Sequence, residues 1–412
     1  MTRPPALDTL ARWPIILGAA LVVRLAAALV VQRYADMKGR LCVFADTDIY
    51  WRLAGQIRAG STYVAMQWEQ PHYALRTPGY PLFLAGCRLL FGDSTLPVRL
   101  VQAAIGASGV WVLAKLVEAA GVKGPGRWSP ALVAASWAAL DPLVAGTSSL
   151  LLSEAVFLPL MLVSLWALAV AWDSPGLKAP ILAGGAMGLG VLVKPSWALF
   201  APLACAGWVA TAGRGRRRLA LRGTLLLGLA MAATMAPWWA RNARVCGRFV
   251  PTAMWLGASL YDGLRPGADG SSDMRFLGDD DIRVLDEPSQ DAALRRRAVD
   301  FALANPGRSL RLAILKAGRY WSPWPNADAL RSRAAAWGAS AVTLPFYIGL
   351  VVGVWSCRRD PRQLTLLLGP LLYFAALHMA FASSIRYRIP AGVPALGLAA
   401  AGWKRIVVRS NS

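Results

Sequence analysis

The stretch from Trp13 to Val31 reads WPIILGAALVVRLAAALVV and carries a single charged residue, Arg24. A helix of about 20 apolar residues crosses the roughly 30 Å hydrocarbon core of a bilayer. This stretch therefore predicts a first transmembrane helix. An arginine inside such a helix costs about 2.5 kcal/mol or more unless it is paired. We therefore expect an acidic or polar partner for Arg24, with Asp141 and Glu154 as the candidate acids.

Similar apolar blocks recur along the 412 residues, of which 56% are hydrophobic and only 16% are charged. These proportions lie outside those of an ordinary soluble domain. We predict an all-α polytopic membrane protein with about ten transmembrane helices. The blocks lie near residues 13–31, 96–116, 129–146, 154–172, 180–193, 197–212, 223–240, 334–355, 364–382 and 389–403.

The net charge of +22 comes largely from Lys and Arg residues beside the apolar blocks. This placement favours membrane lipid over nucleic acid as the partner, because nucleic-acid sites need a solvated basic patch. Short loops rich in Lys and Arg stay in the cytoplasm. We expect a multi-pass protein of the cell (inner) membrane with both termini cytoplasmic. The loop residues that set this orientation are Lys115, Lys123, Arg127, Arg214, Arg216, Arg217, Arg218, Arg222, Arg358, Arg359, Arg362, Lys404, Arg405 and Arg409.

This orientation divides the chain into three parts. Residues 1–240 form a transmembrane catalytic module that includes a first outer loop at 32–95. Residues 241–333 form an outer cap loop, and residues 334–412 form the C-terminal transmembrane helices. The two outer segments hold 16 of the 22 acidic residues. Acid–base chemistry is therefore expected outside the cytoplasm.

The five cysteines and two histidines show no metal-binding spacing. There is no CxxC pair and no Cys/His cluster, so neither a zinc site nor a disulfide framework is indicated. Cys42 and Cys246 could pair if both face outward. The acidic triplet at 279–281 follows a glycine in a polar stretch and is interpreted as a solvated loop. We expect no dedicated metal ligands.

The string Phe44-Ala45-Asp46-Thr47-Asp48-Ile49-Tyr50 follows the first apolar block and places two carboxylates at the outer membrane edge. In a structural interpretation, one of these acidic or hydroxyl side chains caps the next helix. In a functional interpretation, Asp46 is a general base that accepts a proton from an attacking hydroxyl or amine. Asp48 then orients Asp46 or holds an ion.

Further motifs follow in a fixed order along the chain. They are Leu75-Arg76-Thr77-Pro78-Gly79-Tyr80-Pro81-Leu82-Phe83, Phe91-Gly92, Leu152-Ser153-Glu154, Gly188-Leu189-Gly190 with Lys194-Pro195, Pro237-Trp238-Trp239-Ala240-Arg241-Asn242 and Arg386-Tyr387-Arg388-Ile389-Pro390. Together with Asp46 and Tyr50, this order resembles the GT-C glycosyltransferases of the protein mannosyltransferase and aminoarabinose transferase type. The resemblance runs from Arg24 to Trp403 and is loose in the cap.

The resemblance implies a GT-C-like helical bundle with an extracytoplasmic active site. It implies a polyprenyl-phosphate sugar donor and an extracytoplasmic acceptor, which is a protein, a lipid or a glycan. Asp46 takes the position of the family's catalytic aspartate. Arg76 takes that of a basic residue near the carrier phosphate, and Tyr50 and Tyr80 lie in the same motifs as candidate substrate-binding residues. No cofactor is required, and a divalent metal at Asp46 and Asp48 stays open.

Basic residues on the outer side suit this chemistry, because the departing polyprenyl phosphate gains negative charge near lipid. Arginine binds phosphate through paired donors, and lysine acts as a point charge. Any one cation could instead extend to the lipid headgroups. The candidate substrate-binding residues are Arg76, Lys194, Arg241, Arg386 and Arg388, with Glu154 as a further site residue.

A second class of function stays open from the sequence. A lipid-linked sugar flippase, a polymerase or a transporter would also place cations beside a polyprenyl phosphate. The requirement for a base at Asp46 distinguishes a glycosyltransferase from a flippase, since a flippase transfers no proton from an acceptor. The donor sugar and the acceptor are not specified by these motifs.

Overall fold

A computed structural model describes residues 12–39, 44, 46–124, 128–173, 176–326 and 332–410. Cys42, whose pairing with Cys246 the sequence leaves open, lies outside these ranges. In the described ranges the regular secondary structure is helical apart from one two-stranded antiparallel hairpin, in which Ala65 pairs with His72. The all-α fold is therefore confirmed.

The first outer segment holds two helices and the hairpin. They are α3 (Asp46–Arg58), β1 (Ala65–Gln67), β2 (Gln70–His72) and α4 (Gly79–Phe91). In the described part of the cap there are five helical elements after α11: α12 (Leu256–Gly263), η2 (Met274–Gly278), α13 (Asp280–Arg283), α14 (Glu287–Ala304) and α15 (Pro306–Trp321).

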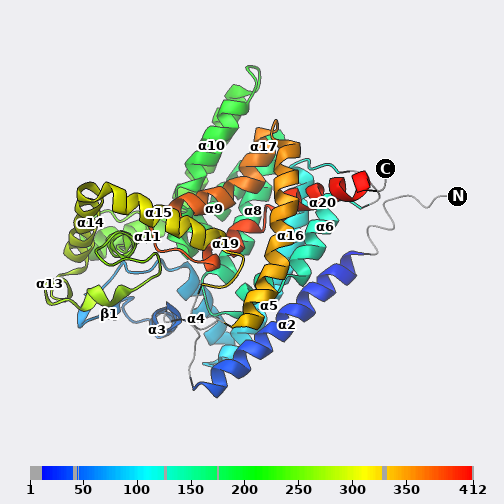
Figure 1. Ribbon diagram of the computed structural model, residues 1–412. Coiled ribbons are helices and arrows are strands. Elements are labelled where there is room, and N and C mark those ends of the chain that lie inside the picture. The colour runs from blue at the N-terminus through cyan, green and yellow to red at the C-terminus, as the bar shows by residue number, and fades with distance from the viewer. Residues whose placement is uncertain are drawn as a thin grey trace.

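The bundle helices coincide with the predicted apolar blocks. They are α2 (Trp13–Met37), α5 (Thr95–Ala119), α6 (Pro130–Leu140), α7 (Pro142–Ser149), α8 (Glu154–Asp173), α9 (Lys178–Val193), η1 (Pro195–Trp197), α10 (Phe200–Thr211), α11 (Arg217–Cys246), α16 (Arg333–Cys357), α17 (Pro361–Gln363), η4 (Leu364–Leu368), α18 (Gly369–Ala380), α19 (Ile385–Gly392) and α20 (Leu396–Ser410). Figure 1 shows α13, α14 and β1 at one end of the molecule, and α20 with the first turns of α2 at the other.

Fewer spans are found than the ten expected. Among the described residues, six helices are long and apolar enough to cross a membrane, and two bent pairs bring the number to eight. The block at 129–146 is bent by 57° between α6 and α7, and the last block is bent by 73° between α19 and α20. Helices α9 and α10 have only 16 and 12 residues. These bends and short helices account for the difference.

The bend between α6 and α7 leaves backbone carbonyl groups that accept hydrogen bonds from Arg24. Pro142 disfavours helical backbone at Asp141, which is extended and instead caps α7 by accepting hydrogen bonds from the backbone N–H groups of residues 143 and 144. The last carbonyl groups of α6 are thereby free for other donors. Buried Arg24 donates to the carbonyl oxygens of Ala138 at 2.9 Å and Ala139 at 3.3 Å, and to that of Ala20 at 3.1 Å. Its partner is thus polar backbone, and Glu154 is engaged elsewhere.

Close approach of the helices depends on glycine. A methyl group added at Gly184 of α9 would lie 2.1 Å from the Leu227 carbonyl oxygen of α11. One added at Gly353 of α16 would lie 2.0 Å from the Leu398 carbonyl oxygen of α20. Small residues at such contacts are typical of helix pairs in membranes. They fix α9 and α20, and hence Lys194 and the end of α19, against the rest of the bundle.

Candidate active site

Helix α3 carries Asp46 and Asp48 in its first turn, where the helix dipole favours acidic side chains. The hydroxyl of Thr47, between them, donates to the Leu151 carbonyl oxygen at 2.8 Å. This buried contact attaches the start of α3 to the segment just before α8. Thr47 therefore points inward, and the next residue, Asp48, is exposed.

Asp46 lies between two arginines from distant parts of the chain. Its Oδ1 accepts from Nη2 of Arg76 at 3.2 Å, and its Oδ2 accepts from Nη1 of Arg386 at 3.2 Å. The Asp46 side chain is still 36% exposed, so a further group can reach it. Burial raises the pKa of this carboxyl, but Arg76 and Arg386 outweigh burial and hold the pKa below its ordinary value. Asp46 is therefore a carboxylate at neutral pH.

Arg386 also contacts a second carboxylate, that of Glu154 at the start of α8. Glu154 accepts from Nε of Arg386 at 2.8 Å and from Nζ of Lys194 at 3.2 Å, and its side chain is only 2% exposed. We name Asp46, Arg76, Glu154, Lys194 and Arg386 the Asp46 cluster. Three cations face two carboxylates, so the cluster has a net charge of about +1 at neutral pH. Such a cluster attracts an anion.

Aromatic rings surround the cations of the Asp46 cluster. The guanidinium of Arg76 lies 4.6 Å from the ring centre of Trp255, at the start of the cap. Arg386 lies 5.3 Å from the ring centre of Phe44 and Lys194 lies 5.2 Å from that of Tyr387. These contacts hold the charged groups in place while one face of Asp46 stays open.

Tyr50 and Tyr80 are buried behind the cluster. Their rings meet edge to face at 5.1 Å, and the Tyr80 hydroxyl donates to the Gln102 side-chain oxygen at 3.2 Å. Burial raises the pKa of Tyr50 above its ordinary value. Both tyrosines are thus placed to support α3, which carries Asp46, and α4, which follows Arg76.

Arg241 and Arg388 lie apart from the Asp46 cluster. Arg241 donates to the carbonyl oxygen of Tyr63 at 2.7 Å and to that of Tyr73, and so ties α11 to the first outer segment. Arg388 is buried and donates to the hydroxyl of Tyr347 and, at 3.5 Å, to that of Thr343, both on α16. The two arginines of the Arg386-Tyr387-Arg388 motif therefore point to different partners.

One carboxylate that the sequence analysis did not select links the cap to the first outer segment. Glu287, at the start of α14, accepts from the backbone N–H groups of Tyr73 at 2.6 Å and Ala74 at 3.0 Å. These residues lie just before Arg76, whose carbonyl oxygen accepts from the Tyr63 hydroxyl at 3.0 Å. The loose match of the cap to known motifs gave no signal for Glu287.

Burial raises the pKa of Glu287 to about 7. The neighbouring His72, whose Nδ1 lies 3.8 Å from the carboxylate, has a pKa lowered to about 4 by burial and does not supply a compensating charge at neutral pH. Folding therefore favours the protonated form of Glu287. The stability that this form contributes is present at low pH and is lost as the pH rises from about 4.5 to about 7.

Glu287→Gln should therefore change the pH dependence of stability. We expect the wild-type chain to lose stability relative to the variant between pH 5 and pH 8, by up to about 3 kcal/mol. Thermal unfolding in detergent at several pH values measures this difference. Asp286→Asn is the matched control, because the pKa of Asp286 lies below its ordinary value and does not change its charge in this range. A difference between wild type and Glu287→Gln that is constant with pH would contradict the expectation.

The comparisons with known proteins agree with this architecture. Residues 75–240 match the sequence family described as dolichyl-phosphate-mannose-protein mannosyltransferase. This range includes Arg76, Glu154 and Lys194 of the Asp46 cluster. No curated protein sequence matches the chain.

Among solved structures, the fold is similar to that of an oligosaccharyltransferase from Archaeoglobus fulgidus. The apo form matches with a TM-score of 0.59 and 14% identity, over 95% of this chain and 51% of the other. The AglB complex with an inhibitory peptide and a dolichol-phosphate matches with a TM-score of 0.58 and 12% identity, over 96% and 50%. The chain thus spans about half the length of these proteins. The partial family match and the shared fold confirm the resemblance of this multi-pass chain to the GT-C membrane glycosyltransferases.

Proposed function

We propose that the chain transfers a sugar from a polyprenyl-phosphate donor to an acceptor outside the cytoplasm, with Asp46 as the general base. The observation that carries this proposal is the position of Asp46: a partly exposed carboxylate held between Arg76 and Arg386, in a cluster with a net positive charge. A donor of this class is supported by the match to the dolichyl-phosphate-mannose-protein mannosyltransferase family and by the dolichol-phosphate in the AglB complex.

In the proposed reaction, an acceptor hydroxyl or amine attacks the anomeric carbon of the sugar. Its proton passes to Asp46, the new glycosidic bond forms, and the bond to the phosphate oxygen breaks. The oxygen keeps the electron pair and leaves as polyprenyl phosphate, which has one more negative charge than the donor. Arg76, Arg386 and Lys194 stabilise this charge as it develops.

The shared arginines couple donor binding to the basicity of Asp46. Without a ligand, Arg76 and Arg386 stabilise the carboxylate and lower its pKa. A phosphate beside the same guanidiniums competes for their hydrogen bonds and adds a nearby negative charge. Both effects raise the pKa of Asp46. Asp46 therefore becomes the stronger base when the donor is bound, which restricts proton transfer to the productive complex.

The direct test is sugar transfer by the purified chain in phospholipid vesicles. A set of polyprenyl-phosphate sugars is offered with protein, lipid and glycan acceptors, and the product is identified by mass. Transfer from one donor with release of polyprenyl phosphate supports the proposal. Donor movement between leaflets without any transferred sugar would instead identify a flippase and refute the enzyme assignment.

The proposed orientation gives a second test. The Lys and Arg bias places the loop around Arg216 in the cytoplasm and residue Ser271 of the cap outside. A reporter that is active only outside the cytoplasm should be active at Ser271 and inactive at Arg216. The reverse result would place Asp46 on the cytoplasmic side and remove the proposed site.

The cluster also predicts the effect of metal removal. Among the residues that the structure describes, no three His, Cys, Asp or Glu side chains converge on one point that could hold a metal ion. Three cations already face the position where negative charge develops. Chelation of divalent ions should therefore lower turnover by less than about threefold. Loss of all activity in chelator, restored by one added metal, would make Asp46 and Asp48 an ion site.

A further inference from the structure

Residues 381–384 form a short linker between α18 and α19, and Arg386 follows the linker in the first turn of α19. The hydroxyl oxygen of Ser384 accepts a hydrogen bond from the backbone N–H of Arg386 at 3.3 Å and so caps α19. The position of the linker therefore decides where the side chain of Arg386 begins. Residues of the cap contact this linker along its length.

Lys316 of α15 holds the start of the linker. Its Nζ donates to the carbonyl oxygen of Ala380, the last residue of α18, at 2.6 Å, and to that of Gly263, the last residue of α12, at 3.1 Å. The Lys316 side chain is fully buried, and burial lowers its pKa to about 8, so it is still charged at neutral pH. A buried ammonium group needs hydrogen-bond acceptors close to it. Lys316 therefore holds the end of α18 against the cap.

Further cap residues hold the rest of the linker. The backbone N–H of Ser383 donates to the carbonyl oxygen of Gly270 at 3.1 Å, and the Ser383 carbonyl oxygen accepts from Nε of Arg319 at 3.2 Å. The backbone N–H of Ile385, the first residue of α19, donates to Oδ1 of Asn326 at 2.9 Å. These hydrogen bonds restrict the movement of the linker relative to the cap.

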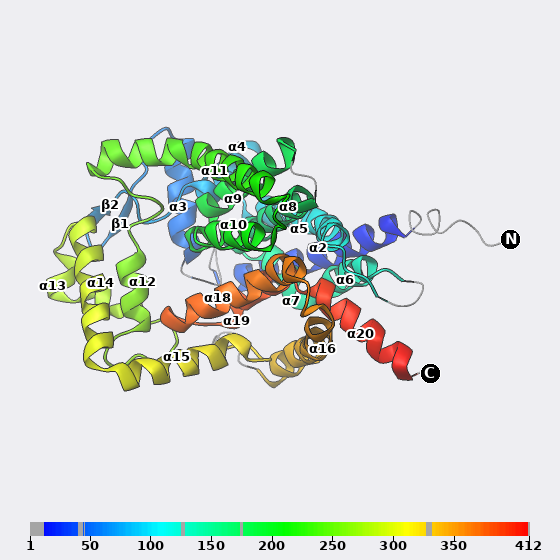
Figure 2. The same ribbon diagram turned by 90° about the horizontal axis from the view of Figure 1, so that it is seen from above.

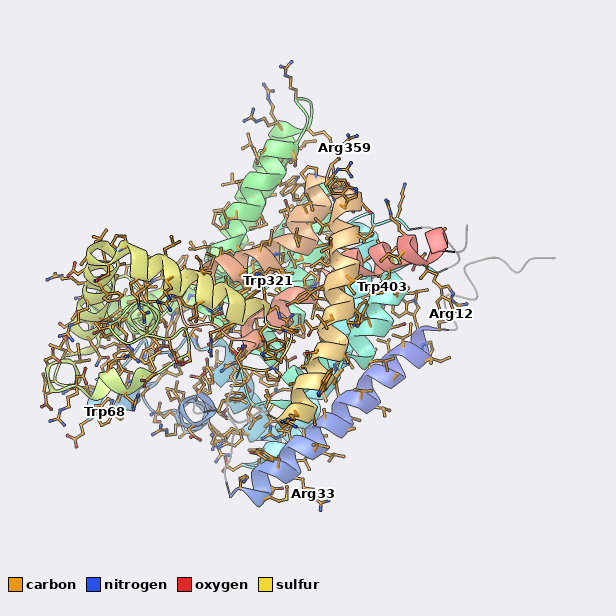
Figure 3. All side chains as sticks on the ribbon, in the orientation of Figure 1. Arg12, Arg33, Trp68, Trp321, Arg359 and Trp403 are labelled. Atoms are coloured by element: carbon orange, nitrogen blue, oxygen red, sulfur yellow. The ribbon has the colours of Figure 1, made fainter. Side chains whose placement is uncertain are left out.

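Helix α15 is itself attached to the bundle. The Tyr320 hydroxyl donates to the carbonyl oxygen of Leu371 in α18 at 2.9 Å, and the Trp321 carbonyl oxygen accepts from the hydroxyl of Tyr347 in α16 at 2.8 Å. Figure 2 shows α15 beside α18 and α19, running from the end of α14 towards α16. Figure 3 shows Trp321, the last residue of α15, near the centre of the molecule and far from Trp68. The helix that carries Lys316 is thus a fixed support for the linker.

We infer that Lys316 and Asn326 are positioning residues for Arg386, because they hold the two ends of the segment from which its guanidinium reaches two carboxylates. Arg386 donates to Asp46 at 3.2 Å and to Glu154 at 2.8 Å. A shift of about 1 Å at the start of α19 breaks the hydrogen-bond geometry at one of them. Loss of either support should therefore separate Arg386 from the more exposed carboxylate, that of Asp46. A weaker hold on the donor phosphate would follow, and this consequence rests on the proposed function.

Carbodiimide labelling of Asp46 tests this role without sugar transfer. The reagent couples glycine ethyl ester to protonated carboxyl groups, so at pH 6 the rate rises with the protonated fraction of Asp46. The full chain is labelled in phospholipid vesicles, and the rate at Asp46 is measured by peptide mass spectrometry relative to that at Asp93. Loss of a cation beside a carboxylate raises its pKa, so we expect Lys316→Met to raise this relative rate about fivefold to tenfold. Asn326→Ala should raise it about threefold.

A second background separates positioning from a general loosening of the chain. Arg386→Gln should raise the relative rate at least as much as Lys316→Met does, and Lys316→Met added to it should raise the rate no further, because Lys316 acts through Arg386. Arg308→Met is the matched control. Arg308 also lies on α15 and donates to a carbonyl oxygen, but its acceptor is Ala268 within the cap, at 2.9 Å. We expect its rate to stay within about twofold of wild type.

Thermal unfolding identifies the variants that fold. A wild-type labelling rate in a folded Lys316→Met or Asn326→Ala chain would overturn the inference, and so would a further rise when Lys316→Met is added to Arg386→Gln. If Lys316→Met does not fold, Asn326→Ala alone and in the Arg386→Gln background decides by the same criteria. The labelling needs neither donor nor acceptor. A wild-type chain that transfers no sugar would refute the proposed function and leave this result unaffected.

Discussion

Asp46→Asn is expected to lower turnover by roughly a hundredfold or more while donor binding changes little. The asparagine has the size of the aspartate but cannot take a proton from the acceptor. It also frees Arg76 and Arg386 from a competing carboxylate. The donor phosphate should therefore bind as tightly as in the wild-type chain, or more tightly. Single-turnover transfer and equilibrium donor binding, measured in lipid, separate the two effects.

The matched control is Asp93→Asn. Asp93 belongs to the same outer segment and also pairs with two arginines, Arg58 at 3.1 Å and Arg88, but it lies outside the Asp46 cluster. Exposed ion pairs of this kind contribute at most about 1 kcal/mol. We expect turnover within about threefold of wild type for Asp93→Asn. An Asp46→Asn chain with full turnover would remove Asp46 as the base, and an equal loss in both variants would indicate a general electrostatic effect.

The helices of the bundle could be predicted because each is a long apolar block. The bends could not be predicted as readily, because each depends on a few residues that interrupt the helical backbone within an apolar block. Asp141 followed by Pro142 ends one helix and caps the next, and the free carbonyl groups then satisfy Arg24. The apolar pattern itself runs through this break without interruption.

The candidate site was predicted in part. Asp46, Arg76, Glu154, Lys194 and Arg386 come together from five separate places in the sequence. Glu154 was expected as a site residue and also, with Asp141, as a candidate partner of Arg24. The motif itself does not indicate that Arg386 and Arg388 contact different partners. Two residues apart on a helix, side chains point about 200° apart around the axis. The cap residues Trp255 and Glu287 carry no motif and were found only through their contacts.

The second large effect is expected at Arg386, whose partners differ from those of Arg388. Arg386→Gln should weaken donor binding and slow turnover together, by about tenfold to a hundredfold each, because Arg386 is the cation that both carboxylates share. Its loss lowers the net charge of the Asp46 cluster from about +1 to about 0. It also leaves the buried Glu154 with one contacting cation, Lys194, and the hydroxyl of Ser153. Arg386→Lys should restore little, since lysine cannot donate to two carboxylates in the planar geometry of a guanidinium.

Arg388→Gln is the control for this prediction, since it removes a guanidinium from the same turn of α19. Its partners Tyr347 and Thr343 lie on α16, so its loss should lower the unfolding temperature but leave donor affinity within about threefold. Glu154→Gln added to Arg386→Gln should lower stability further, because it removes the carboxylate that the buried Lys194 contacts at 3.2 Å. Equal losses of donor affinity in Arg386→Gln and Arg388→Gln would show that the two arginines act on the phosphate together. The separate roles that the contacts of Arg386 and Arg388 indicate would then be wrong, and the phosphate site would have to include the Arg388 side of α19.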